Sequence, residues 1–253
     1  MMLSLSWAVL VLALAGPAEA QLDRGIKLYE SGDLAGALAA FEAAAKADPK
    51  DPRAPYMRGR TLDKKGDAAG AEKAYREALG RNPRFPQAHN ELGALLLARG
   101  DRSGAEKEFV AAAKADPKYP DAHYNLGLLR DSEKKLPEAV AAYREAARLR
   151  PEDAAIRLNL GAALRRTGDV DGAVGELRTA TRLAPANAVA WSNLGLLLSD
   201  RKAFDEAAAA LRKATELDPK YAAAWNGLGR VEQRRKQPAA RAASGSLSTR
   251  PRQ

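Results

Sequence analysis

The stretch "AWSNLGLLL", residues 190–198, carries the pattern from which the architecture follows. Its residues Trp191, Leu194, Gly195 and Leu198 follow the spacing i, i+3, i+4, i+7, which places them on one side of an amphipathic helix. Glycine recurs at the same place every 34 residues, at 25, 59, 93, 127, 161, 195 and 229. Proline keeps the same step at 49, 83, 117, 151, 185 and 219. A constant step of this size indicates an array of structural repeats.

A second helix is predicted in each repeat. It carries a column of alanines from Ala37 to Ala207 and, four residues later, a column of bulky apolar residues from Phe41 to Leu211. We predict a polar turn between the two helices at sequences such as "SGD" or "TGD", because glycine favours the C-terminal end of a helix. We expect the glycine of the first helix to lie opposite the alanine of the second, where the two backbones approach most closely.

These residues resemble the tetratricopeptide repeat family, whose pattern is W-x2-L-G-x2-Y, then A-x3-F, then P. The best match has Trp191, Leu194, Gly195, Leu198 in place of Tyr, Ala207, Leu211 in place of Phe, and Pro219. The resemblance implies an all-α fold, a right-handed superhelical solenoid of helix-turn-helix repeats over residues 21–236. We expect six 34-residue repeats and a C-terminal capping helix. The resemblance also implies a role in protein binding without specifying the partner.

The two ends of the chain depart from the repeats. Residues 1–20 hold an apolar run followed by "PAEA", in which Ala18 and Ala20 stand at the small-residue positions of a signal-peptide cleavage site. We therefore predict a mature chain that begins at Gln21, has no transmembrane segment and is periplasmic or secreted. Residues 237–253 are predicted to be a disordered basic tail, since residues 233–253 supply six of the nine net positive charges and no acid.

Motifs for catalysis and metal binding are missing from the sequence. The chain has no cysteine, and its two histidines, His89 and His123, fall at the position that Trp191 holds in its repeat. We predict that both histidines belong to the apolar core stripe. Nucleotide-binding, zinc-protease and serine-hydrolase signatures are absent. The sequence therefore predicts no enzymatic activity, no cofactor and no metal site.

Asparagine marks another side of the first helix. When the glycine is counted as position 8 of each repeat, Asn125, Asn159 and Asn193 fall at position 6, about 200° around the helix from it. In a stacked array this side lines the concave surface, which is the usual binding face. The pattern resembles the asparagine ladder in the repeats of the O-GlcNAc transferase family, and such amides suit a peptide backbone. A hydrogen bond between neighbouring repeats is the alternative role.

Further polar side chains are predicted to line the same surface. At positions 5, 9, 12 and 13 they are Asn90, Tyr56, Tyr124, Arg60, Arg165, Arg166, Arg230 and Arg234. Because guanidinium groups favour carboxylates, the expected ligand is an extended acidic segment or one that ends in a free carboxylate. We predict an exported, non-catalytic scaffold that binds such a segment in its concave groove. The alternative is a structural cell-envelope component of a polysaccharide-export or assembly machine, which contacts anionic polymer or lipid through the basic tail. Nucleic acid is not an expected partner, since the tail has no aromatic residue for base stacking.

Overall fold

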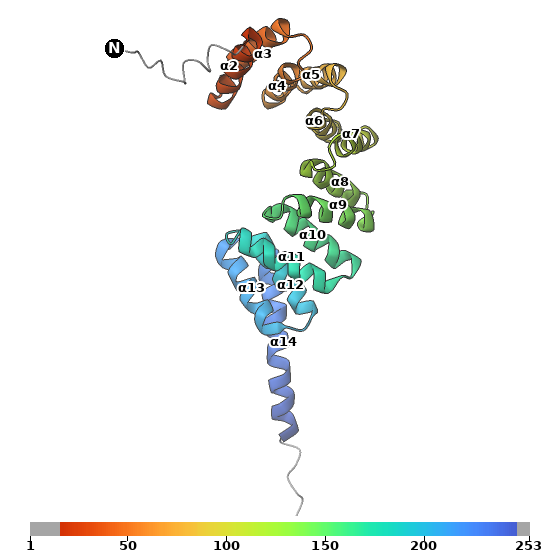
Figure 1. The fold of residues 1–253 in the computed structure, drawn as a ribbon. Coiled ribbons are helices and arrows are strands. Elements are labelled where there is room, and N and C mark those ends of the chain that lie inside the picture. Colours follow the sequence, from red (N-terminus) through yellow and green to blue (C-terminus); the bar gives the residue numbers. More distant parts are fainter. Residues whose placement is uncertain (1–15, 247–253) are drawn as a thin grey trace, which may run out of the picture. The chain divides into compact units, whose positions relative to one another are not determined.

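The computed structural model describes the backbone of residues 16–246 and the side chains of residues 16–236, and this part of the chain is helical without strands (Figure 1). Each of the first six repeats has an A helix followed by a B helix, and a seventh A helix follows them. The A helices are α2 (Pro17–Ser31), α4 (Arg53–Lys64), α6 (Pro86–Ala98), α8 (Pro120–Ser132), α10 (Ala154–Thr167), α12 (Ala188–Asp200) and α14 (Ala222–Ser246). The B helices are α3 (Leu34–Ala47), α5 (Ala68–Arg81), α7 (Arg102–Ala115), α9 (Leu136–Leu149), α11 (Val170–Leu183) and α13 (Phe204–Leu217). The predicted all-α repeat fold is confirmed.

The turn between A and B helices has a recurring geometry. Gly32 lies in the left-handed region at φ 85°, and Asp33 then caps α3 by accepting a hydrogen bond from the Gly36 backbone N–H at 2.9 Å. The same Gly-Asp pair precedes α5, α7 and α11. Glycine reaches a positive φ without steric cost, which explains why "GD" recurs in the sequence. Lys134 and Lys202 adopt the positive φ, 62°, in two repeats that lack this glycine.

From α2 to α12, the glycine at position 8 lies under the bulky residue of its B helix. A Cβ added to Gly195 would lie 2.6 Å from Leu211 Cγ and 3.0 Å from the Ala207 carbonyl oxygen. The residues that cover the other glycines in this way are Phe41, Tyr75, Phe109, Tyr143 and Leu177. The expected contact with the alanine column was therefore incomplete. The bulky side chain fills the space above the glycine, and Ala207 approaches with its backbone.

The buried side of the A helices differs from the predicted stripe at position 4. In α6, Ala88 at position 3 and Leu95 at position 10 are buried, whereas His89 at position 4 is half-buried. Position 3 is buried because it packs on the preceding repeat: Ala54 of α4 belongs to the apolar cluster of α2 and α3. The prediction that His89 and His123 are core residues was wrong, since an A helix turns its buried arc toward two neighbours and leaves position 4 at the edge.

The chain divides into two units, residues 1–126 and 127–253, which are described separately. In the first unit, α2 overlaps the predicted signal peptide. It begins at Pro17, and Glu19 pairs with Arg53 of α4, with Oε2 2.6 Å from Nη2. Cleavage after Ala20 would therefore remove this ion pair and the first turn of α2. Residues 1–15, with the apolar run, lie outside the described residues.

In the second unit, α14 is longer than the predicted capping helix. It continues through Ser246 and so includes residues 237–246, which the sequence analysis assigned to a disordered tail. The prediction of disorder was wrong for this part, where alanine is frequent and favours helix. The remaining residues, 247–253, lie outside the described ones. None of the described helices has the length and apolar character needed to cross a membrane.

Candidate binding face on the A helices

Position 4 of the A helix is tied to the loop that precedes it. In five repeats its side chain forms a hydrogen bond with the carbonyl oxygen of the proline six residues earlier, at 2.9–3.1 Å. The residues are His89, His123, Arg157, Trp191 and Trp225. His89 also places Nδ1 2.7 Å from Glu108 Oε2, and this carboxylate raises the pKa of His89. Within the described residues, no three His, Asp or Glu side chains are grouped so that they could hold a metal ion.

The asparagine ladder has a structural bond in the first unit. Asn125 of α8 donates from Nδ2 to Oδ1 of Asn90 of α6 at 2.8 Å, and Asn90 is buried. A buried amide that loses its partner costs about 1–3 kcal/mol. This bond therefore stabilises the contact between two repeats, which is the alternative role considered for these amides.

Asn159 of α10 and Asn193 of α12 are half-buried on the A helices of the second unit. The Asn193 amide makes no hydrogen bond within residues 16–236. Beside it, Ser192 is fully buried, and its Oγ has no hydrogen-bond partner among the described residues. Buried polar atoms are normally paired. Unused hydrogen-bonding capacity thus remains on α12, unlike at Asn125.

Arg60 lies among aromatic rings in the first unit. Its guanidinium carbon is 5.5 Å from the centre of the Tyr29 ring and 5.9 Å from the centre of the Tyr56 ring. Tyr56 in turn packs on Phe85, with ring centroids 5.0 Å apart. Such cation–π contacts compensate part of the arginine charge. This surface is therefore aromatic in character as well as polar.

Glu91, at position 6 of α6, interacts electrostatically with Arg60 on this surface. Burial raises the pKa of Glu91, and the Arg60 charge acts in the opposite direction. Burial also raises the pKa of Tyr56 to about 12, and the Glu91 charge adds to this shift. Because a carboxylate and phenol groups surround Arg60, this part of the first unit suits an anionic ligand less well than the sequence suggested.

Three of the predicted arginines come together in the second unit. Arg165 of α10 and Arg230 and Arg234 of α14 line a cavity of about 110 Å³, which we call the arginine pocket. Its other lining residues are Leu196, Ser199, Asp200 and Gly227. Arg165 Nη2 lies 2.7 Å from Asp200 Oδ2, whereas Arg230 and Arg234 form no ion pair within the described residues. The pocket therefore carries two positive charges that no acid compensates.

Two other predicted site residues lie outside this pocket. Arg166 pairs with Asp131 of α8 instead, and Tyr124 of α8 is half-buried. Ser199 and Asp200 were not predicted as site residues from the sequence. The acid lies 35 residues after Arg165, just as Arg166 lies 35 residues after its own partner. The spacing of an acid and an arginine by about one repeat is the sequence signal that could have predicted these ion pairs.

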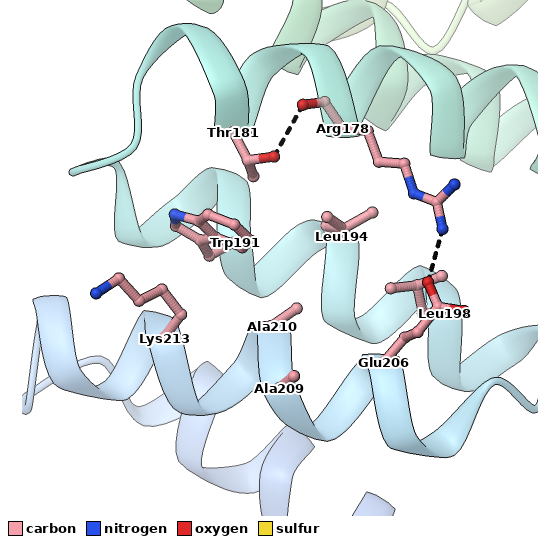
Figure 2. Close-up of a pocket in the computed structure, with 9 residues that line it drawn as sticks. All are labelled: Arg178, Thr181, Trp191, Leu194, Leu198, Glu206, Ala209, Ala210 and Lys213. Carbon is pink, nitrogen blue, oxygen red and sulfur yellow. Dashed lines mark hydrogen bonds and ion pairs between the residues drawn. The ribbon is translucent and has the colours of Figure 1, made fainter.

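A second concavity lies on the B-helix side of repeat 6 (Figure 2). Side chains of α11 and α13 flank a groove of about 510 Å³, and Trp191, Leu194 and Leu198 of α12 form its floor. Arg178 and Glu206 stand at one end and form an ion pair, with Nη2 2.6 Å from Oε2. The groove is mainly apolar and open to solvent.

The groove is open because of a small residue. In repeats 3 and 5, a glutamate of the B helix reaches the position-4 side chain: Glu108 contacts His89, and Glu176 contacts Arg157 at 2.8 Å. The corresponding residue in repeat 6 is Ala210, which cannot span this distance to the indole of Trp191. Pairing at position 4 is thus replaced by an exposed apolar surface.

The family model of the tetratricopeptide repeat matches the chain over residues 10–52, 22–83, 56–120, 90–154, 130–188, 158–222 and 192–248. No curated protein sequence gives a match.

Several solved structures are similar to this chain. YrrB, described as a TPR protein with an unusual peptide-binding site, is 22% identical, with a TM-score of 0.65 over 74% of this chain and 96% of that chain. PilF of Pseudomonas aeruginosa is 19% identical, with a TM-score of 0.75 over 85% of this chain and 97% of that chain. MamA of Desulfovibrio magneticus RS-1 is 24% identical, with a TM-score of 0.56 over 69% of this chain and 98% of that chain. These likenesses show a shared fold. With the repeat matches along nearly its whole length, the chain belongs to the tetratricopeptide repeat family.

Proposed function

We propose that this protein is an exported, non-catalytic scaffold that binds an extended acidic segment of another protein on the A helices of its second unit. Tetratricopeptide repeats form scaffolds suited to protein–protein interaction, and the arginine pocket supports the finer proposal. Arg230 and Arg234 stand one helical turn apart, so their like charges destabilise each other in the free protein. A bound carboxylate removes this repulsion and accepts charge-assisted hydrogen bonds.

The size of the arginine pocket limits what it can hold. About 110 Å³ accommodates one carboxylate-bearing side chain or a chain terminus, and not a folded surface. The Ser199 hydroxyl supplies a neutral donor beside the two guanidinium groups. Because Arg165 forms an ion pair with Asp200, Arg230 and Arg234 are the residues that would bind the anion. We therefore assign the acidic preference to α14.

The rest of an extended ligand would follow the A helices. Neighbouring packed helices lie about 8–10 Å apart, which an extended chain covers in roughly three residues. The amide of Asn193 on α12 is available to a peptide backbone, because it makes no bond within residues 16–236. In this proposal the arginine pocket holds the charge and Asn193 holds the backbone.

A labelled decapeptide of alternating alanine and glutamate tests the proposal by fluorescence anisotropy. The double variant Arg230→Gln, Arg234→Gln should weaken binding at least about tenfold, because hydrogen bonds to charged groups contribute about 1.5–3 kcal/mol each. The matched control is Arg24→Gln, Arg182→Gln, which removes two exposed arginines outside the pocket. Equal affinity of the two double variants contradicts the assignment. Amidating the peptide C-terminus separates capture of a terminal carboxylate from capture of a side chain.

Two further measurements address the alternative function and export. If polygalacturonate binds and removal of residues 237–253 abolishes that binding, while the decapeptide does not bind, the envelope-component alternative is favoured. Anionic-polymer binding should also weaken steeply with salt. Export is tested by N-terminal sequencing of the protein from its native host. A start at Gln21 supports the signal peptide, and an intact N-terminus contradicts it.

A further inference from the structure

Within residues 16–246, no B helix follows α14 to cover it. An added Cβ at Gly229 meets nothing within 4 Å, whereas at Gly195 it would lie 2.6 Å from Leu211 Cγ. Trp225 of the same helix is 51% exposed. The position-8 glycine of each earlier A helix lies under a bulky side chain. The corresponding site on α14 is therefore an empty half of a repeat.

The uncovered side of α14 is continuous. Trp225, Gly229 and Lys236 are exposed and follow helical spacing along it, and the half-buried Leu228 and Glu232 lie at its edge. The opposite side is occupied, since Ala224 and Val231 are buried. We call Trp225, Leu228, Gly229 and Lys236 the open face. It has the same residue types, an indole, a leucine and a glycine, that α12 uses to pack on α13.

The residues one repeat after α13 lack the pattern of a covering B helix. The B-helix residues Ala207, Leu211 and Ala214 correspond, one repeat later, to Arg241, Gly245 and Ser248. A bulky apolar residue is thus missing where one is required. Moreover, α14 runs on through Ser246, so residues 237–246 continue the A helix and do not fold back as a B helix.

Charge decides between a second copy of this chain and a different protein. Within α14 there are five basic residues and one acid, Glu232, so two α14 helices side by side would repel each other. The α13 helix shows what is compatible: Asp205, in its first turn, accepts from Arg235 of α14, with Oδ1 2.8 Å from Nη2. An acidic start also suits the dipole of the covering helix.

We propose that the open face of α14 is a docking site for one amphipathic helix of a partner protein, which completes the seventh repeat. The partner helix has the B-helix pattern: a small residue, a bulky apolar residue four positions later, and a small residue three positions after that. It carries acidic residues in its first turn, which lie near Lys236 when the helix runs antiparallel to α14. This surface is distinct from the arginine pocket, so the two sites are tested independently.

The probe is a helical peptide with the sequence of α13, residues 204–217, stapled on the side away from Leu211 and carrying a fluorophore. We expect it to bind the full chain. A peptide with Leu211→Ala should bind at least about tenfold more weakly, because the bulky residue supplies the contact with the glycine. A peptide with Asp205→Lys and Glu206→Lys should also lose affinity, and more so at low salt. Equal binding of all three peptides overturns the proposal.

The matched protein variant is Gly229→Leu. Its side chain enters open space in the free chain, so the variant folds, and circular dichroism should show unchanged helix content. It should nevertheless lose peptide binding at least about tenfold, since a covering helix can no longer approach. Retained binding overturns the proposal. So does a dimer in light scattering that Gly229→Leu dissociates, because a second copy would then be the occupant. The variant Arg230→Gln, Arg234→Gln should still bind the peptide.

Discussion

The A helices of repeats 6 and 7 share the tryptophan, leucine and glycine of the repeat pattern but lie in different surroundings. Trp191 and Trp225 both donate to a proline carbonyl oxygen, at 2.9 and 3.0 Å. In repeat 6 the glycine four residues later lies under Leu211, while in repeat 7 Gly229 is open. The comparison shows that one motif forms a core contact where a B helix follows and an uncovered surface where, among the described residues, none follows.

The largest expected effect comes from removing the residue that distinguishes the two repeats. Leu211 is fully buried, so Leu211→Ala should lower the free energy of unfolding by about 2–5 kcal/mol through lost burial and a cavity. Urea denaturation followed by circular dichroism measures this. Trp225→Ala, at a half-exposed position, should change it by less than about 1 kcal/mol. A loss as large as that of Leu211→Ala would mean that Trp225 is a core residue after all.

The glycine of repeat 6 should not tolerate a methyl group. Gly195→Ala places Cβ within 3.0 Å of both Leu211 and the Ala207 carbonyl oxygen, and the backbone oxygen cannot move aside freely. We expect a loss of about 1–3 kcal/mol in the free energy of unfolding, as for overpacked cores. The same denaturation experiment applies. Unchanged stability would show that the helix pair has space that the structure does not contain.

The same substitution in repeat 7 should have the opposite sign. Gly229→Ala meets no atom within 4 Å, and alanine is the better helix former. The free energy of unfolding should rise by about 0.5–1 kcal/mol. Changes of opposite sign in the free energy of unfolding at Gly195 and Gly229 would support the difference between the two repeats. Destabilisation at both positions would contradict it.

The smallest expected effect is a pH dependence at position 4 of repeat 3, where His89 replaces tryptophan. The Glu108 carboxylate raises the pKa of His89 above its ordinary value of 6.5. A raised pKa in the folded state means that the contribution to stability is fully present below about pH 6.5 and is lost as pH rises through the raised value. Melting temperatures from pH 5 to 9 should therefore fall more for the native chain than for Glu108→Gln. Parallel curves would contradict this.

Much of the fold could be predicted because its causes are local in the chain. The glycine and alanine columns, the Gly-Asp turns and the helical spacing all repeat every 34 residues, so each repeat confirms the others. The predictions that were wrong concern residues of the A helices that contact both their own repeat and the preceding one. Position 4 was predicted to be core, yet it bonds to the preceding loop, because position 3 already fills the contact with the previous repeat.

The candidate site was less predictable. Asn125 and Asn193 hold the same position, but Asn90 pairs with the first, and Leu158 stands in the place of Asn90, 35 residues before the second. The predicted arginines also differ in whether an acidic side chain forms an ion pair with them. Arg165 and Arg166 are adjacent in sequence and pair with different helices. The 34-residue period therefore identifies the side of the A helices on which these polar residues lie, but not which of them pair with each other.

The sequence by itself determined the repeat, its length and the helix pair, because these depend on short-range spacing. Only the tertiary structure decided which polar groups remain unused, because pairing depends on side chains a full repeat apart. It brought Arg230 and Arg234 into one pocket and left Gly229 uncovered. Both features arise on α14, which no B helix covers among the described residues.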